Sequence, residues 1–214
     1  GVDAWDSDSY LNMWVCNLTG NILGYAQFPG GNPETDGVVI DYEAFGDIGT
    51  AQPPFHLGRT GTHEVGHYLN LRHTWGSGGC SSDDYVADTP VTSGANYDSL
   101  PCDFPGSNSC TIGNDDLPDM FQNYMDYSDD ACMNLFTNGQ KVRMRAQFAP
   151  GGWRYGLLTS DGCGVRDVTC ADGIQNGDET GIDCGGAACM PCACFEGPIY
   201  LTLMFDDYPL ENSW

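Results

Sequence analysis

The chain has 214 residues, of which 41% are hydrophobic and 12% aromatic. This length and composition indicate a folded globular protein with one sizeable core, or one domain plus a small module, and exclude a disordered chain. The 30 acidic and 7 basic residues give a formal net charge of -23, which argues against nucleic acid and anionic membranes as partners, because both bind basic patches. The same charge favours bound cations and cationic substrates, although an acidic surface that only keeps the protein soluble in salt explains it equally well.

The 11 cysteines indicate an oxidising, extracellular location with disulfides, so we expect a secreted protein. Their odd number leaves at least one thiol unpaired. Cys16 ends an apolar run at residues 11–16, and we expect it to be buried and unreactive. No apolar stretch approaches the roughly 18–20 residues that span a bilayer, and no signal peptide opens the chain, so we expect its start to be a processed or trimmed end.

Three strands are predicted in the first 42 residues, at 10–18, 24–28 and 37–42, the first of them buried. A loop then leads to Thr60 and Thr62, both residue types that cap helix N-termini, and a helix is predicted over residues 61–70.

Residues 74–124 are rich in Gly, Ser, Asp and Pro and are expected to be irregular. The next helix should start after Thr137, because Thr137 and Gln140 fit a capping box, and should stop before Pro150. Six cysteines between 163 and 194 predict a Cys-rich disulfide module or linker at 161–194, and 195–214 reads as the start of a further β domain, with a strand at 199–205.

The segment 63–73, HEVGHYLNLRH, carries the chemistry. Residues four apart lie on one helix face, so His63 and His67 can point at one ion, while Glu64 can reach a water on that ion without binding the metal. A continuing helix would carry His73 away, so the chain must turn, and Asn70 is suited to a left-handed turn.

Three histidines would leave the fourth position of a zinc ion to water, which Glu64 would deprotonate before passing the proton to the leaving amine. The alternative is an ordinary buried helix with structural histidines. Three of the 4 histidines fall at these spacings, which favours the catalytic reading. The fourth, His56, is expected to be a loop or core residue.

This pattern resembles the metzincins, whose motif is HExxHxxGxxH followed by a methionine turn, and the asparagine at position 70 resembles the pappalysin family, especially its ulilysin-like bacterial members. Residues 123–133 look like that family's Met-turn. The resemblance implies an α+β catalytic domain over 1–160, with a twisted sheet, an active-site helix, and an irregular lower half that ends in a helix. It implies Met125 as an apolar floor beneath the metal and Tyr127 as a donor to the oxyanion; both could instead be core residues. Metzincin domains usually have a strand and a long backing helix before the strand seen here at 10–18, so we expect that segment to have been trimmed or to associate as a separate piece.

The resemblance also implies two disulfides, Cys80 with Cys110 and Cys102 with Cys132, whereas spacing alone allows three pairings. For the remaining cysteines the connectivity stays open: Cys163, Cys170, Cys184, Cys189, Cys192 and Cys194.

The acidic loop at 82–90 predicts a calcium site as well as zinc. Hard oxygen ligands on a loop suit calcium, and by resemblance the ligands would be Asp84 and Thr89, joined by Asp88. The alternative is a solvated acidic loop.

The sequence therefore predicts a secreted, monomeric zinc endopeptidase that acts on protein or peptide substrates. The resemblance to ulilysin-like enzymes implies a preference for Arg or Lys after the scissile bond, for which Asp129 and Asp130 after the Met-turn could supply the acidic group. A thermolysin-like enzyme would take its third ligand from a distant glutamate, which His73 argues against. A calcium-dependent adhesive module with a relic zinc site is the alternative from another class, and the presence of Glu64 argues against it.

Overall fold

The computed structural model of the chain describes residues 3–111 and 117–160. The described residues up to Leu158 belong to one compact unit. The Cys-rich segment and the predicted strand at 199–205 lie outside the described residues.

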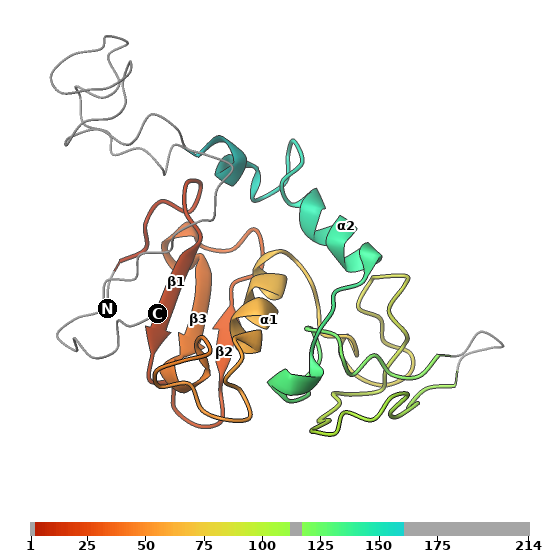
Figure 1. Ribbon diagram of the computed structural model, residues 1–214. Helices are drawn as coiled ribbons and strands as arrows, with labels where there is room; N and C mark the ends of the chain where they lie inside the picture. The colour runs from red at the N-terminus through yellow and green to blue at the C-terminus, as the bar shows by residue number, and fades with distance from the viewer. Residues whose placement is uncertain (1–2, 112–116, 161–214) are drawn as a thin grey trace, which may run out of the picture. The chain divides into compact units, whose positions relative to one another are not determined.

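The three predicted strands form one small sheet with the order β1-β3-β2 (Figure 1). Strand β3 (Gly37–Asp41) lies in the centre, parallel to β1 (Asn12–Cys16) and antiparallel to β2 (Gly24–Ala26). The run of hydrophobic residues in β3 fits this central place, because a strand with neighbours on both sides and cover on its faces has few exposed positions. Each strand is shorter than predicted.

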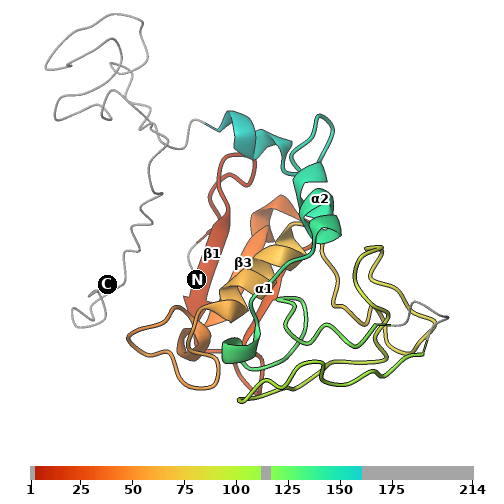
Figure 2. The ribbon, with the colours of Figure 1, turned by 45° about the vertical axis from the view of Figure 1, so that its right-hand side comes forward.

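Helix α1 (Arg59–Tyr68) packs against β2 and β3, and both views show it lying along one face of the sheet (Figures 1 and 2). The core between them holds four fully buried side chains: Val38, Ile40, Ala44 and Tyr68. Fixing α1 to a packed sheet is what makes the side chains on its other face suitable for a rigid site.

The prediction that Thr60 or Thr62 caps this helix is wrong. The N-cap is Gly58, whose φ of 73° lies in the left-handed region, and no side chain caps the helix. The Thr62 hydroxyl instead donates to the Gly58 carbonyl at 3.2 Å. Glycine adopts positive φ without steric cost, so the chain can turn sharply into α1.

The predicted irregular region is confirmed, since no helix or strand lies between Tyr68 and Asp130 among the described residues. Disulfides link Cys80 with Cys110 and Cys102 with Cys132, the pairing that the resemblance implied. Apart from a second α-helix near residue 140, the other regular pieces in the described chain are short 3-10 helices: Pro33–Thr35, Tyr42–Ala44, Asp130–Cys132 and Tyr155–Thr159.

Cys16 is exposed, so the prediction of a buried thiol is wrong. The residue ends β1, an edge strand with a neighbour on one side only, and edge positions are covered less than central ones.

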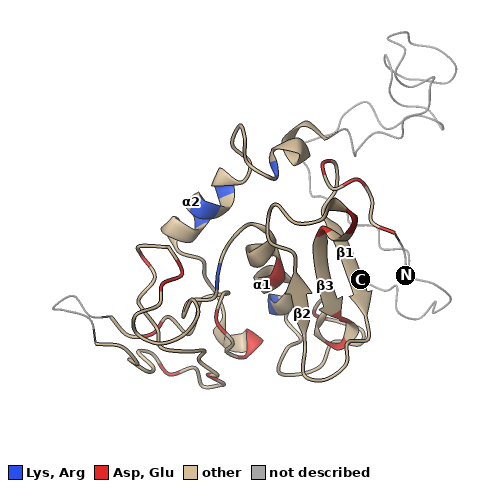
Figure 3. Ribbon diagram, turned by 180° about the vertical axis from the view of Figure 1, so that it is seen from behind, with Lys and Arg blue, Asp and Glu red and all other residues tan. Residues whose placement is uncertain are grey.

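Helix α2 (Asn138–Ala146) begins as predicted. Thr137 is its N-cap, and both hydrogen bonds of the capping box with Gln140 are present. The helix ends at Ala146, well before Pro150. Three of the basic residues, Lys141, Arg143 and Arg145, lie on α2, where Figure 3 shows the blue ribbon.

An ion pair missed in the sequence fixes the segment after α2 to the sheet. Arg154 is 4% exposed and pairs with Asp36, while its guanidinium lies 3.5 Å from the centre of the Tyr68 ring. Among the described residues, no helix is both long and apolar enough to cross a membrane.

Candidate active site

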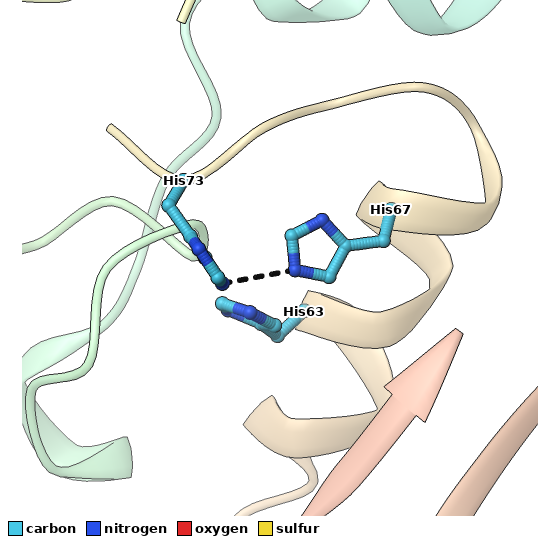
Figure 4. Close-up of side chains that lie close together, drawn as sticks. All are labelled: His63, His67 and His73. Carbon is cyan, nitrogen blue, oxygen red and sulfur yellow. Dashed lines mark hydrogen bonds between the residues drawn. The ribbon is translucent and has the colours of Figure 1, made fainter. Parts of the chain in front are cut away.

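Helix α1 carries two histidines and a glutamate, of which His63 and Glu64 line one cleft. His63 and His67 lie one turn apart, with ring centroids 4.6 Å from each other, and both are buried. This is the same-face placement that the spacing of four predicts. Figure 4 shows the two rings leaving consecutive turns of the helix on the same side.

A left-handed turn at Asn70 brings the third histidine back. Asn70 has a φ of 74°, as the sequence predicted. The backbone N–H groups of Asn70 and Leu71 donate to the carbonyls of His67 and Gly66, at 2.8 and 2.9 Å, which closes the end of α1. His73 follows this turn, and its ring points toward the other two (Figure 4).

The three histidines could hold a metal ion. One ring nitrogen of each lies within 4.8 Å of the others, and His67 Nε2 is 3.0 Å from His73 Nε2. Two nitrogens bound to one tetrahedral zinc at ~2.0–2.1 Å would lie about 3.3 Å apart, so the spacing fits. No other group of three such ligands occurs among the described residues.

Hydrogen bonds at Nδ1 leave the Nε2 atoms of the two helical histidines available to bind a cation, and burial keeps the rings neutral. His63 Nδ1 lies 2.7 Å from the Tyr124 carbonyl and His67 Nδ1 2.8 Å from the Leu71 carbonyl, which fixes Nδ1 as the protonated atom and Nε2 as the lone pair. Burial and the neighbouring histidines lower the pKa of His63 to about 3, and burial and His67 lower that of His73 to about 3. The rings are therefore neutral at pH 7, the form that binds metal.

Glu64 lies beside the histidines and lines the same cleft. It is 6% exposed, and its Oε2 has no hydrogen-bond partner among the described residues. Burial raises the pKa of its carboxyl to about 8. A β-carbon on Gly24 of β2 would lie 2.9 Å from Glu64 Cγ, so the sheet edge passes directly beside this carboxyl.

Met125 is fully buried beneath α1, where a β-carbon on Gly66 would clash with its Sδ. The Met125 N–H donates to Asn123 Oδ1 at 2.9 Å, which holds the turn. Tyr127 is 41% exposed, and its ring lies 4.9 Å from His73 and 5.6 Å from His63, measured between centroids. Tyr127 thus lies at the histidine cluster, and Met125 lies beneath the helix that carries two of its members.

Trp75 belongs to the same cluster and was missed by the sequence reasoning. Its ring stacks on His73 at 4.3 Å with an angle of 11°, and meets the Tyr127 ring at 4.8 Å. An aromatic residue two positions after the last histidine was the available signal.

The cleft has a volume of about 1060 Å³ and extends from His63 and Glu64 along β2 and past Tyr127. Asp130 lines it, and its Oδ2 accepts the backbone N–H groups of Leu57 and Arg59 at 2.7 and 3.2 Å. Asp129, the other predicted specificity residue, is not among the lining residues.

The acidic loop brings two of its three predicted calcium ligands together. The buried Asp84 carboxylate accepts the Thr89 hydroxyl at 2.9 Å on each oxygen, and burial raises the pKa of Asp84 to about 6. The Asp88 carboxylate instead accepts the Thr137 hydroxyl at 2.6 Å and the Gly139 N–H at 2.8 Å, at the start of α2.

The chain is similar to a known family of metallopeptidases and to several of its members. A family model for Peptidase M43, described as Pregnancy-associated plasma protein-A, matches residues 2–149. An extracellular metalloprotease of Verticillium alfalfae is 41% identical over 149 residues, which cover 64% of this chain and 48% of the relative. Extracellular metalloprotease 1 of Coccidioides posadasii is 38% identical over 148 residues, covering 64% and 49%.

Among solved structures, mature mirolysin of Tannerella forsythia in complex with a cleaved peptide is 51% identical, with a TM-score of 0.66 over 73% of this chain and 59% of that one. The chain spans about half the length of the curated relatives it matches.

Proposed function

This chain belongs to the pappalysin family of metallopeptidases, and on that premise we propose that it is a secreted zinc endopeptidase with Glu64 as its general base. The observation that carries the proposal is the convergence of three neutral histidines, two buried and one half-buried, with a carboxyl that has a buried oxygen without a partner among the described residues, at the edge of a cleft.

His63, His67 and His73 would hold the zinc ion through their ring nitrogens. When bound, zinc supplies Lewis-acid polarisation of the scissile carbonyl and lowers the pKa of a water molecule toward about 7. Two carbonyls, of Tyr124 and Leu71, keep the helical histidines in the required tautomer.

Glu64 takes the proton of the attacking water and passes it to the leaving amine. Burial raises the pKa of this carboxyl, so its carboxylate is a stronger base than that of an exposed glutamate. A neighbouring cation acts in the opposite direction and keeps the group ionised before the reaction. Its free Oε2 faces no competing donor within the described chain.

Tyr127 would donate its hydroxyl hydrogen bond to the oxyanion of the tetrahedral intermediate. Burial, and then the Glu64 charge, raise the pKa of Tyr127, so the hydroxyl remains protonated at neutral pH. A preorganised donor of this kind stabilises developing negative charge in a site with little water.

The substrate would lie extended along β2. This strand pairs with β3 on one side only, which leaves the other edge for a peptide strand beside Glu64. Asp130 supports a preference for Arg or Lys after the scissile bond, because it is the buried acid of the two predicted ones and lines the cleft.

A calcium ion would be held by the loop at Asp84 and Thr89, whose buried carboxylate needs a compensating cation when ionised. Chelation of calcium with EGTA should speed heat inactivation while zinc stays bound. Equal melting curves with and without calcium would contradict the proposed calcium site.

The zinc proposal is tested by metal removal and return. A zinc chelator should abolish casein hydrolysis, and one equivalent of zinc per chain should restore it, whereas magnesium should not. A chain that binds one zinc and hydrolyses nothing would favour the adhesive module with a relic site, and a chain that hydrolyses casein without zinc would refute the proposal.

A further inference from the structure

Trp75 lies in ring-to-ring contact with two residues of the proposed site and has no role in the account above. Its indole is stacked on the third histidine at 4.3 Å between centroids, and the same indole meets the Tyr127 ring edge-on at 4.8 Å and 74°. His73 and Tyr127 are themselves 4.9 Å apart at 72°, so the three rings contact one another pairwise.

His73 is the histidine that most needs external support. His63 and His67 are rooted in α1, and each has a ring nitrogen on a backbone carbonyl. His73 lies in the loop after α1, and its one hydrogen-bonding contact among the described residues runs from Nε2 to His67 Nε2. A metal takes up Nε2, so contacts between rings are left to fix the plane of the imidazole, and the indole is the ring that stacks parallel to it, whereas Tyr127 and His67 meet it edge-on.

The backbone on both sides of Trp75 is anchored. Before it, the Thr74 N–H donates to the Met125 carbonyl and the Thr74 hydroxyl to Asp126 Oδ2, both at 3.3 Å. After it, Gly76 has a φ of 56°, and a β-carbon there would lie 2.6 Å from Ser82 Oγ. The Ser77 N–H donates to the same Ser82 oxygen at 2.7 Å. The backbone that carries the indole is thus anchored to the 125–126 turn on one side and to the loop at Ser82 on the other.

We propose that Trp75 is a positioning residue that fixes the His73 imidazole for zinc and limits the movement of Tyr127. A flat aromatic ring does this in two ways. Parallel stacking restricts rotation of the imidazole, and the negative face of the indole favours the positively polarised, metal-bound ring over the free one. Partners that orient a metal ligand without touching the metal typically change metal affinity by 10–100-fold.

The inference rests on the proposed function, and its test measures the release of zinc rather than the hydrolysis of a substrate. The rate of zinc transfer from the loaded chain to an excess of chromogenic chelator is measured for wild type, Trp75→Phe, Trp75→Leu and Trp75→Ala. Trp5→Ala is the control, because this indole is 65% exposed and its ring contacts Tyr10 instead of the site.

We expect the leucine and alanine variants to release zinc at least about tenfold faster than wild type, and the phenylalanine variant to stay within about threefold, because it keeps a flat ring. Trp5→Ala should match wild type. In the zinc-saturated leucine variant, kcat should fall more than KM rises, since Tyr127 acts on the intermediate.

Release at the wild-type rate from all three variants, or equal release from the leucine and phenylalanine variants, would overturn the role of Trp75. Unfolding of both the leucine and the phenylalanine variant, seen by circular dichroism, would also overturn the role, because the Trp75 side chain would then stabilise the core and not the site. A wild-type chain that binds no zinc would instead refute the proposed function itself.

Discussion

The side-chain amides of Asn123 and Gln140 form a reciprocal, fully buried pair: Asn123 Nδ2 donates to Gln140 Oε1 at 2.8 Å, and Gln140 Nε2 donates back to Asn123 Oδ1 at 3.0 Å. Gln140 is also the capping-box residue of α2, and Asn123 Oδ1 accepts the Met125 N–H. The start of α2 is therefore joined directly to the turn beneath the histidines.

Replacement of Gln140 should destabilise the fold. Gln140→Ala removes a capping bond and leaves the buried Asn123 amide without its partner, so we expect a loss of about 2–4 kcal/mol in the free energy of unfolding. Urea denaturation measures it. Lys141→Ala, at an exposed neighbouring position, should change stability by less than about 0.5 kcal/mol. Equal effects of the two would show that the amide pair contributes little.

Loss of the third histidine should weaken zinc binding. His73→Ala removes one of three nitrogen ligands, and we expect the affinity to fall by more than about 100-fold, beyond the range for an outer partner. Competition with a chelator of known affinity measures it. His56→Ala is the control, because His56 is the one histidine outside the cluster. Unchanged zinc content in His73→Ala would refute its assignment as a ligand.

Cleavage before basic residues should depend on Asp130 and not on Asp129. Asp130→Asn keeps an acceptor for the Leu57 and Arg59 N–H groups and removes the charge, so kcat/KM for peptides with Arg or Lys after the cut should fall about 10–100-fold. Aliphatic peptides should be unaffected, and so should the Asp129→Asn control. A peptide-library digest in which wild type cuts mostly before aliphatic or aromatic residues would contradict the preference.

The stability of the calcium-free chain should depend on pH through Asp84. Its folded pKa of about 6 lies above the ordinary 3.8, so the folded state favours the protonated form, and stability falls as pH rises from about 4 to above 6. The size of this pKa shift limits the loss in the free energy of unfolding to about 3 kcal/mol. Added calcium should offset this loss, and its effect on Tm should appear only as the carboxylate ionises.

The variant Asp84→Asn should flatten both the pH dependence and the calcium effect. Asp103→Asn, at an exposed position outside the acidic loop, is the matched control and should behave as wild type. If the two variants melt alike at every pH with and without calcium, Asp84 is not the group responsible.

The local features of the site could be read from the sequence because each depends on a few neighbouring residues. Spacing of four placed His63 and His67 together, the left-handed tendency of asparagine placed the turn at Asn70, and Thr137 with Gln140 marked the start of α2. Hydrophobic runs likewise located the three strands, although their ends were overestimated.

Features that depend on long-range contacts could not be predicted. Gly58 replaced Thr60 and Thr62 as the cap of α1 because the preceding loop enters the helix through a left-handed turn. Cys16 was expected in the core, and its place on an edge strand follows only from the strand order. Asp36 and Arg154 are 118 positions apart, and no local pattern indicates their ion pair.

The measurement that tests the central claim most directly is casein hydrolysis by zinc-loaded Glu64→Ala, with zinc content determined on the same sample. Glu43→Ala, which alters another acid lining the cleft, is the control. The account predicts one zinc per chain in all three proteins, a fall in kcat of at least about 10²–10⁴-fold in Glu64→Ala, and near wild-type activity in the control. Hydrolysis by zinc-loaded Glu64→Ala within tenfold of wild type would contradict Glu64 as the general base.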